Sequence, residues 1–399
     1  MGGVADYSGA LVLETPIRET TRVAVEALES PRLLFESRGY TTVDVESPAL
    51  SSLLDGRPPC AEIRAGLDAL GLPAWVRYPL GCLIVLARAR AFEHARGYAF
   101  RIESTVPRSQ GVGSSAALEI ATLRALALLH GVKFEGTELA RLGQEAENQL
   151  VGAPCGLMDQ LTCAFGEPGA LLPILCRPDR LRPGVTLPSG VLVAGWPSGV
   201  EHSVAESPYL VARTASFMGK RILEAGSETR WRYASEIPPD LLGASASALV
   251  PTTIRGDEFL SSYGPLDDPL CRIEPTREYA VLSALRFPIE EHARCTEAIS
   301  LLARESGLDP RPALERVGEL MFQSHRGYSS IGLGHRQTDR MVDALRRLGP
   351  GAGIYGARVS GGGSGGSVVV LMRQEARPQL EAVSREVFAE AAGPQPLIF

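Results

Sequence analysis

A strand that passes through two glycines into a serine-led helix is the most constraining feature of this sequence. Residues Gly97–Val106 (GYAFRIESTV) have the composition of a strand. Gly111 and Gly113 follow, and Ser114–His130 is rich in alanine and leucine. Glycines let backbone N–H groups approach an anion, and the first turn of a helix supplies further donors. The segment therefore predicts either a plain serine-capped helix or a phosphate site.

Two common phosphate-binding loops are excluded here. No lysine follows the glycines, as G-x-x-x-x-G-K-[ST] requires, and the third glycine of G-x-G-x-x-G is missing. A phosphate site in this loop would belong to another architecture.

The hydrophobic pattern changes along the chain. An alternation of apolar and polar residues predicts antiparallel strands over Ala10–Ile17, Thr21–Ala27, Leu33–Glu36 and Tyr40–Val45. Trp75–Phe92 predicts a helix, and helical patterns dominate from Pro208 onward. Because strands and helices are partly segregated, we expect an α+β fold rather than a doubly wound sheet.

Two domains are expected from the length and from one change in composition. The chain has 399 residues, enough for one large domain or two moderate ones. Proline and glycine concentrate between Pro173 and Pro188. This segment is the best candidate for a boundary, which gives domains 1–185 and 186–399.

Composition argues against several classes of partner. Forty basic and 46 acidic side chains give a net charge of −6, so there is no footprint for nucleic acid or an anionic membrane. No run approaches the roughly 20 apolar residues of a membrane helix, and no secretory signal is visible, so we expect a cytoplasmic protein. The seven cysteines form no C-x-x-C pair, which favours free thiols over zinc or disulfides.

Two carboxylates flank a loop of glycine and proline. Glu147 falls on a predicted helix, and Asp159 follows the loop VGAPCG near the start of another. One carboxylate could accept a hydroxyl proton while the other holds a metal ion. The alternatives are a solvated helix face for Glu147 and a helix cap for Asp159.

Five glycines fall within six positions, from Gly361 to Gly366, between two predicted strands of a hairpin over Ile354–Met372. A tight hairpin needs only one or two glycines. The density indicates that backbone passes very close to a ligand or to another loop.

In this order the three segments resemble the motifs of the GHMP small-molecule kinases, most closely the galactokinase branch. The resemblance rests on MGGVADYSGALVLETPI, VPRSQGVGSSAALEIA, VGAPCGLMDQ, GVEHSVAESPY, MFQSHRGYSSIG and GIYGARVSGGGSGG, which cover nearly the whole chain. The opening ADYSG, the loop VGAPCGLMDQ and the terminal PLIF are closer still to the kinase domain of L-arabinokinases.

The resemblance implies a fold, a reaction and a set of site residues. The fold would have an N-terminal ATP-binding domain with a mixed sheet and helices, a C-terminal α/β sandwich domain, and an active site in the cleft between them. The reaction would be ATP- and Mg²⁺-dependent phosphorylation of a sugar at its anomeric hydroxyl, which needs positioning and charge neutralisation. The implied residues are Asp159 as the base; Ser115 and Glu147 at Mg²⁺; Gly111, Val112, Gly113, Ser114, Ser115 and Ala116 around the phosphates; Asp6, Gly156 and Tyr209 at the sugar; and Trp75 near adenine.

One departure from the galactokinase pattern bears on the sugar. Galactokinases read G-E-H-T-D-Y where this chain reads GGVADY over residues 2–7. In that branch the glutamate contacts the C6 hydroxyl of galactose, and Gly3 and Val4 cannot make such hydrogen bonds. L-Arabinopyranose has galactose's ring configuration without C6, so we expect L-arabinose as substrate. Galactose or another hexose, and a catalytically silent sugar and nucleotide sensor, are the alternatives.

A second departure concerns an arginine that the family places a few residues upstream of this motif. The sequence begins inside the motif, at Met1. Three explanations for the missing arginine are open. The start of the sequence is assigned too late, the chain is a piece of a longer multidomain protein, or another cation takes the place of this arginine. The partners expected are a small-molecule sugar and ATP, with the oligomeric state left open.

Several other polar residues are expected to be structural. We expect His202 and His325 to be hydrogen-bonded structural histidines, and Cys155 to pack rather than react. Glu291 and Arg294, spaced i, i+3, predict a solvated pair. Arg358 is expected either to brace the glycine cluster or to reach phosphate.

Overall fold

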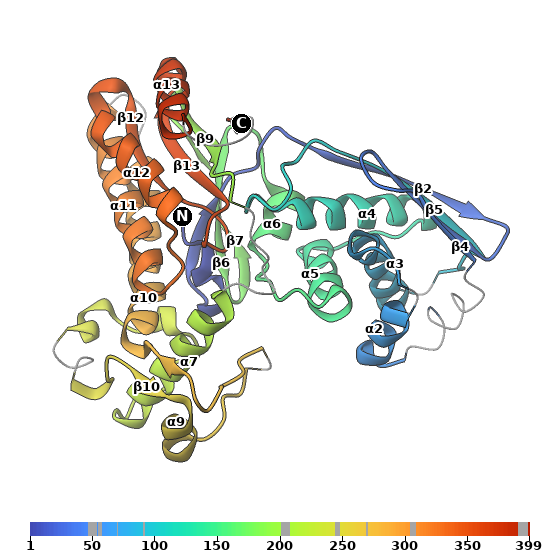
Figure 1. The fold of residues 1–399 in the computed structure, drawn as a ribbon, viewed down its shortest axis with the longest axis horizontal. Helices are drawn as coiled ribbons and strands as arrows, with labels where there is room; N and C mark the ends of the chain where they lie inside the picture. Colours follow the sequence, from blue (N-terminus) through green and yellow to red (C-terminus); the bar gives the residue numbers. More distant parts are fainter. Residues whose placement is uncertain are drawn as a thin grey trace. The chain divides into compact units, whose positions relative to one another are not determined.

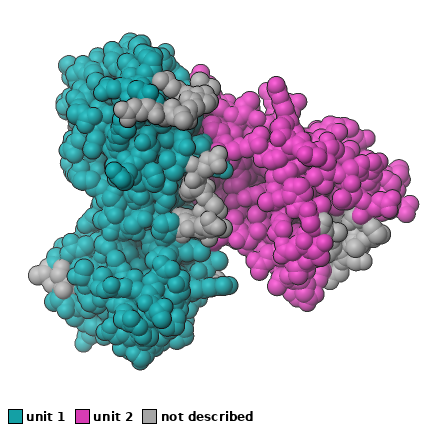
Figure 2. Space-filling view, viewed as in Figure 1, with its two compact units in different colours: residues 1–16, 109–112, 167–399 teal, residues 17–108, 113–166 magenta. Residues whose placement is uncertain are grey.

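A computed structural model describes residues 1–46, 54, 58–69, 71–90, 92–200, 208–243, 248–268, 270–303, 309–389 and 398–399. Contacts divide the chain into two units (Figure 2). Unit 1 comprises residues 1–16, 109–112 and 167–399, and unit 2 comprises residues 17–108 and 113–166. The segment from Pro173 to Pro188 lies within unit 1, and the division at 185/186 stays a prediction about the domains.

Unit 2 is a four-stranded sheet with helices packed on one of its faces (Figure 1). Its elements are β2 (Thr21–Leu28), β3 (Arg32–Ser37), β4 (Val43–Glu46), α2 (Cys60–Ala69), η2 (Ala74–Val76), α3 (Arg77–Ala89), β5 (Gly97–Ser104), α4 (Ser114–His130), α5 (Glu138–Glu145), the π-helix η3 (Ala146–Val151) and α6 (Met158–Phe165).

The strand order in this sheet is β2-β5-β3-β4. Strand β5 lies between β2 and β3, antiparallel to the first and parallel to the second. The early strands β3 and β4 pair antiparallel as expected, but β2 and β3 do not pair with each other, because a strand some 60 residues later lies between them. The sheet is mixed, as the family resemblance implies.

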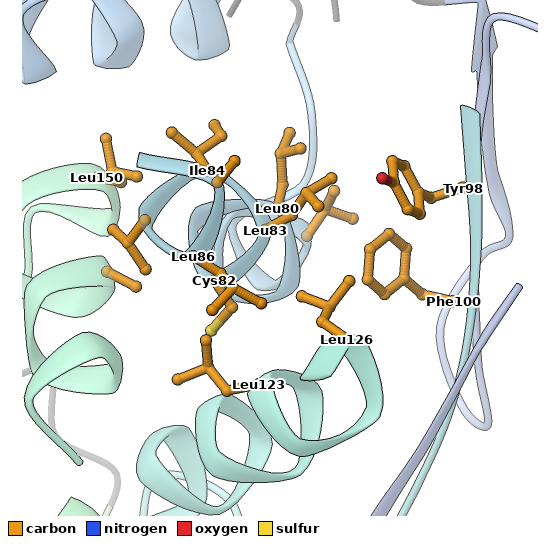
Figure 3. Close-up of a cluster of buried hydrophobic side chains, with 14 of the residues drawn as sticks. Leu80, Cys82, Leu83, Ile84, Leu86, Tyr98, Phe100, Leu123, Leu126 and Leu150 are labelled. Atoms are coloured by element: carbon orange, nitrogen blue, oxygen red, sulfur yellow. The ribbon is translucent and has the colours of Figure 1, made fainter. Parts of the chain in front are cut away.

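The core of unit 2 forms between α3, α4 and the sheet. Helix α3 buries nearly every residue from Pro79 to Ala87, so it is apolar all round rather than on one stripe. Figure 3 shows Leu80, Leu83, Leu126 and Phe100 directed toward one another from α3, α4 and β5. Helix α4 contributes Ile120, Leu123 and Leu126 to this core.

Unit 1 contains the remaining elements. These are η1 (Gly3–Ser8), β1 (Leu11–Glu14), β6 (Ala170–Cys176), β7 (Asp179–Leu181), β8 (Val185–Thr186), β9 (Val191–Pro197), α7 (Tyr209–Ala225), η5 (Ala234–Glu236), η6 (Pro239–Leu242), β10 (Ile254–Arg255), α9 (Gly256–Tyr263), β11 (Glu278–Tyr279), α10 (Val281–Leu302), α11 (Arg311–Ser330), α12 (Arg336–Leu348), η7 (Pro350–Ala352), β12 (Ile354–Val359), β13 (Ser367–Arg373), η8 (Gln374–Ala376) and α13 (Arg377–Val387).

Three sheets organise unit 1. Strand β1 pairs with β6, which also pairs with β7 and β8. The predicted closing hairpin is confirmed as the antiparallel pair β12 and β13, and β9 joins β13. Helices α11, α12 and α13 pack on this second sheet (Figure 1), and a short β10–β11 pair lies apart with α9. Among the described residues, no helix combines the length and apolarity that crossing a membrane requires.

Candidate active site

The N-terminus of α4 is built by glycine rather than by serine. Gly113 is the N-cap, with φ 67°, and no side chain caps the helix. The first helical hydrogen bond runs from Ala117 N to the carbonyl of Gly113, 2.9 Å. The amides of Ser114, Ser115 and Ala116 therefore precede the helical ladder, as in an anion site, and the simple serine-cap alternative is wrong.

Asp159 lies beside this helix terminus. It belongs to the first turn of α6, whose N-cap is Leu157, so Asp159 is not the cap. A Cβ built on Gly113 would lie 3.3 Å from the Asp159 Cγ. The predicted base and the predicted phosphate-binding amides are thus neighbours within unit 2.

Glu147 and Ser115 also come together. Glu147 lies on η3, is buried, and accepts a hydrogen bond from Ser115. Burial raises the pKa of Glu147, while hydrogen bonds from Cys155 and Ser115 oppose the rise. The solvated-face alternative for Glu147 is wrong, because the π-helical turn directs this carboxylate inward. Such turns are frequent at functional sites.

This pair suits a magnesium ion held with a nucleotide. Mg²⁺ takes oxygen ligands and commonly binds one or two protein side chains, with waters and phosphates completing its shell. A serine hydroxyl and a carboxylate provide two such oxygens. Among the described residues, no group of three His, Cys, Asp or Glu could form an all-protein metal cage.

A second buried carboxyl group, Glu119, was missed by sequence reasoning. Gln160 Nε2 donates to Glu119 Oε2 at 3.0 Å and to Glu147 Oε2 at 2.9 Å. Glu119 is 0% exposed, and burial, followed by the charge of Glu147, raises its pKa well above the usual range. A glutamate within the alanine-rich stretch SSAALEIA was the available signal.

The loop before Asp159 is held by side chains of the preceding helices. Asn148 Oδ1 accepts from Cys155 N at 2.7 Å, and the Gln144 and Asn148 amides donate to the Cys155 carbonyl. Gly156 follows directly in this loop. Burial raises the pKa of the Cys155 thiol well above its usual range, so Cys155 stays neutral, as expected for a packing residue.

Trp75, in η2, packs into an aromatic group. Its ring lies 6.3 Å from Phe35, edge to face, and 4.9 Å from Tyr40. The indole is half-buried in unit 2. Its contact with adenine stays a prediction.

The predicted sugar residues of unit 1 form a second cluster. Asp6 is 3% exposed and accepts from Tyr7 N at 2.7 Å. Burial raises the pKa of Asp6 to about 6, while Arg213 and the Tyr7 amide oppose the rise. Tyr209 is buried nearby, its ring edge-to-face with Tyr7 at 6.0 Å between centroids.

Arg213 is a further member of this cluster that sequence reasoning missed. It lies one helical turn after Tyr209 on α7 and donates to Asp268 Oδ2 at 2.7 Å. Its guanidinium is buried and lies 5.5 Å from the centre of the Tyr7 ring. Arg213 is thus a buried cation beside Asp6.

The glycine cluster packs backbone against backbone, as its density indicates. A Cβ at Gly361 would lie 2.8 Å from the carbonyl oxygen of Gly111, and one at Gly366 would lie 3.2 Å from that of Gln110. Gly111 and Val112 thus belong to unit 1, whereas Gly113–Ala116 belong to unit 2. A single cleft formed by the two groups of residues stays a prediction.

The structural residues have mixed outcomes. His325 accepts from Val359 N and contacts Asp339, which confirms a structural role, whereas His202 lies outside the described residues. The predicted solvated pair is wrong. Glu291 is 0% exposed and accepts from Gly2 N as well as from Arg294.

Comparison with known proteins agrees with these motifs. Residues 77–167 match the GHMP kinases N terminal domain, and residues 302–390 match the GHMP kinases C terminal family. L-Arabinokinase of Arabidopsis thaliana is 30% identical over 100% of this chain and 44% of its own length. Galactokinase of Chloroflexus aggregans is 34% identical over 81% of this chain and 73% of its own length.

A solved structure shares the fold. Lactococcus lactis galactokinase, complexed with galactose, aligns with a TM-score of 0.76 at 19% identity over 100% of this chain and 89% of that chain. At this identity the likeness shows the fold alone. The fold, the family matches and the extent of the galactokinase similarity together place this chain in the GHMP kinase family.

Proposed function

We propose that this chain is an ATP- and Mg²⁺-dependent sugar 1-kinase, with L-arabinose as its sugar and L-arabinose 1-phosphate as its product. The observation that carries the kinase proposal is the grouping in unit 2 of Asp159, the α4 amides and the Ser115–Glu147 pair. The chain spans less than half of the L-arabinokinase that it matches, so this proposal concerns the segment described.

Each of these residues has a defined role in the proposed reaction. The amides of Ser114–Ala116 hold phosphate oxygens at the N-terminus of α4. Asp159 accepts the proton of the anomeric hydroxyl while the oxygen of that hydroxyl forms a bond to the γ-phosphorus of ATP. The bond between this phosphorus and the β–γ bridging oxygen breaks at the same time, and ADP departs. Ser115 and Glu147 would hold Mg²⁺, which would neutralise phosphate charge.

The sugar is inferred from the turn that carries Asp6. The aspartate of the galactokinase motif is retained as Asp6 and is buried. Its carboxylate can therefore accept a hydrogen bond from a sugar hydroxyl, as in galactokinases. Gly3 stands where galactokinases have the glutamate that contacts C6. A substrate without C6 leaves no hydroxyl unpaired there, which favours a pentopyranose over galactose.

A coupled ADP-release assay with L-arabinose and D-galactose, offered separately to the same preparation, tests this proposal. We expect turnover with both ATP and Mg²⁺ present and a higher kcat/KM for L-arabinose. A preference for galactose would contradict the pentose assignment and leave the kinase intact. A variant with Asp159→Asn should bind sugar without turnover. Sugar and nucleotide binding by the wild type, with no turnover of either sugar, would instead favour the sensor.

A further inference from the structure

The side-chain amide of Gln160 joins two buried carboxyl groups of unit 2. Its nitrogen lies 3.0 Å from Glu119 Oε2 and 2.9 Å from Glu147 Oε2, and both separations are those of hydrogen bonds. A primary amide has two N–H donors, which is enough to serve both carboxyl oxygens at once. From its position on α6, one nitrogen atom thus links α4, which carries Glu119, to η3, which carries Glu147.

Glu119 has no access to solvent. Its side chain and that of Gln160 are both 0% exposed. The backbone of α5 closes over the pair, because a Cβ built on Gly143 would lie 3.2 Å from Gln160 Cγ and 3.4 Å from Glu119 Oε2. A carboxyl group without solvent contact is not available as a ligand for a nucleotide or a metal ion. Any effect of Glu119 on the proposed site must therefore pass through its neighbours.

Glu147 is the neighbour on which these contacts converge. Four side chains form hydrogen bonds with its carboxylate: Cys155, Ser115, Glu119 and Gln160. Ser115 is itself a proposed metal ligand, and Cys155 belongs to the loop before α6. Glu119 and Gln160 are bonded to each other as well as to Glu147, so the three side chains form a closed set of hydrogen bonds. Ser115 and Glu119 are four residues apart on α4, which places both on the face of this helix that meets Glu147.

We propose that Glu119 is a positioning residue that, together with Gln160, holds the Glu147 carboxylate in the orientation that a magnesium ligand needs. The inference rests on the proposed function, in which Ser115 and Glu147 would hold Mg²⁺. A glutamate side chain loses rotamer freedom when its carboxylate binds a metal ion, and neighbours that fix it beforehand reduce this entropic cost. Loss of a hydrogen-bonding partner of a metal ligand typically lowers metal affinity by about 10- to 100-fold.

The first test measures ADP binding by calorimetry, once with Mg²⁺ and once with EDTA in its place. The dissociation constant in EDTA divided by that in Mg²⁺ reports the metal contribution apart from nucleotide binding. Glu119→Met removes the hydrogen bonds at a similar side-chain length and should lower this ratio about tenfold. Glu119→Gln keeps an oxygen that accepts from Gln160, so its ratio should stay within about twofold of the wild-type ratio. Because both replacements are uncharged, their comparison separates hydrogen bonding from charge.

Thr122→Val is the matched control on the same helix. Thr122 is also 0% exposed, but its hydroxyl donates to the Leu118 carbonyl at 2.7 Å, within α4. This variant should lose stability in urea unfolding and keep the wild-type ratio. A ratio that Glu119→Met leaves at the wild-type value would overturn the inference. So would a ratio that Glu119→Gln lowers as far as Glu119→Met does.

The second test asks whether Glu119 and Gln160 act as one unit. Gln160→Met should lower the same ratio by a similar factor, and the double variant should lose no more than the more affected single variant. Losses that multiply in the double variant would show two independent effects and would contradict the inference. Where Glu119→Met does not fold, Gln160→Met serves in its place, since it removes the bridging amide. An unchanged ratio in that variant would again contradict the inference.

The wild-type protein separates this inference from the proposed function. ADP binding that is absent, or that Mg²⁺ does not strengthen, would contradict the magnesium part of the proposed function and, with it, the role of Glu119. Binding that Mg²⁺ strengthens equally in the wild type and in Glu119→Met would overturn the inference alone. A ratio lowered in Glu119→Met and retained in Glu119→Gln supports both.

Discussion

The carboxyl group of Asp159 lies against the backbone of Gly113, the N-cap residue of α4. This arrangement brings a carboxyl group to the N-terminus of a helix. Position 113 therefore has two reasons to be glycine, its φ of 67° and the proximity of Asp159.

Gly113→Ala should separate these two reasons when compared with Gly131→Ala at the other end of α4. Gly131 has φ 68° with nothing within 4 Å of its Cβ position. Both changes should cost about 1–2 kcal/mol of unfolding free energy for the left-handed backbone. Only Gly113→Ala should also lower kcat, by tenfold or more, because it displaces Asp159. The kcat values should be compared on samples that chemical denaturation shows to be equally folded. Equal kcat values for the two variants would contradict the proximity argument.

The substitution Glu147→Gln should weaken the binding of the Mg²⁺ that the proposed reaction requires. Removing the charge of this proposed metal ligand should raise the Mg²⁺ concentration for half-maximal rate by at least about tenfold. A thermal shift on adding Mg²⁺ and ADP should shrink in parallel. Glu145→Gln, two residues earlier at the end of α5, is the control and should behave as the wild type.

Asp6→Asn should change stability in a pH-dependent way. Because the folded-state pKa of Asp6 is raised from 3.8 to about 6, the folded protein binds a proton more tightly than the unfolded chain. The contribution of Asp6 to the free energy of unfolding is therefore lost as pH rises from about 4 to about 6. This loss amounts to about 3 kcal/mol at most. The asparagine variant lacks this loss, so its Tm relative to wild type should be higher at pH 7 than at pH 4. A difference that is constant with pH would contradict the raised pKa.

Glu291→Gln should destabilise unit 1 strongly. Its carboxylate accepts from Gly2 N, Ser324 Oγ and Arg294, and the guanidinium of Arg294 is itself largely buried. Neutralising one partner of a buried pair should cost about 3 kcal/mol in urea unfolding. Glu297→Gln, on the same helix α10, breaks an exposed pair with Arg316 and should cost less than about 1 kcal/mol.

The sequence predicted elements with strong local signals. The α4 helix and the β12–β13 hairpin have the predicted bounds within two residues, because alanine-rich and β-branched runs fix them locally. The π-helical turn at Glu147 was not predicted, since an extra residue in a helical turn has no periodic signature. Helix α10 begins at Val281 and continues through Pro288, a residue that sequence reasoning treats as a break in a helix.

Burial of charged groups was the least predictable feature of the site. Glu291 reads as exposed on its own helix, yet its partners include Gly2, which is 289 positions away in the chain. Glu119 and Arg213 have no motif of their own and become notable only through Gln160 and Asp6. Such pairings depend on tertiary neighbours, which a helical period does not encode.

The contact between Gly361 and Gly111 has a consequence for how this chain can change over generations. Every missense mutation of a glycine codon adds at least a Cβ, and at Gly361 that atom would lie 2.8 Å from the Gly111 carbonyl oxygen. Neither a conservative nor a radical replacement at Gly361 escapes this conflict, so we expect selection against any side chain at this position. The close approach of the two loops therefore depends on a position whose only acceptable side chain is a hydrogen atom.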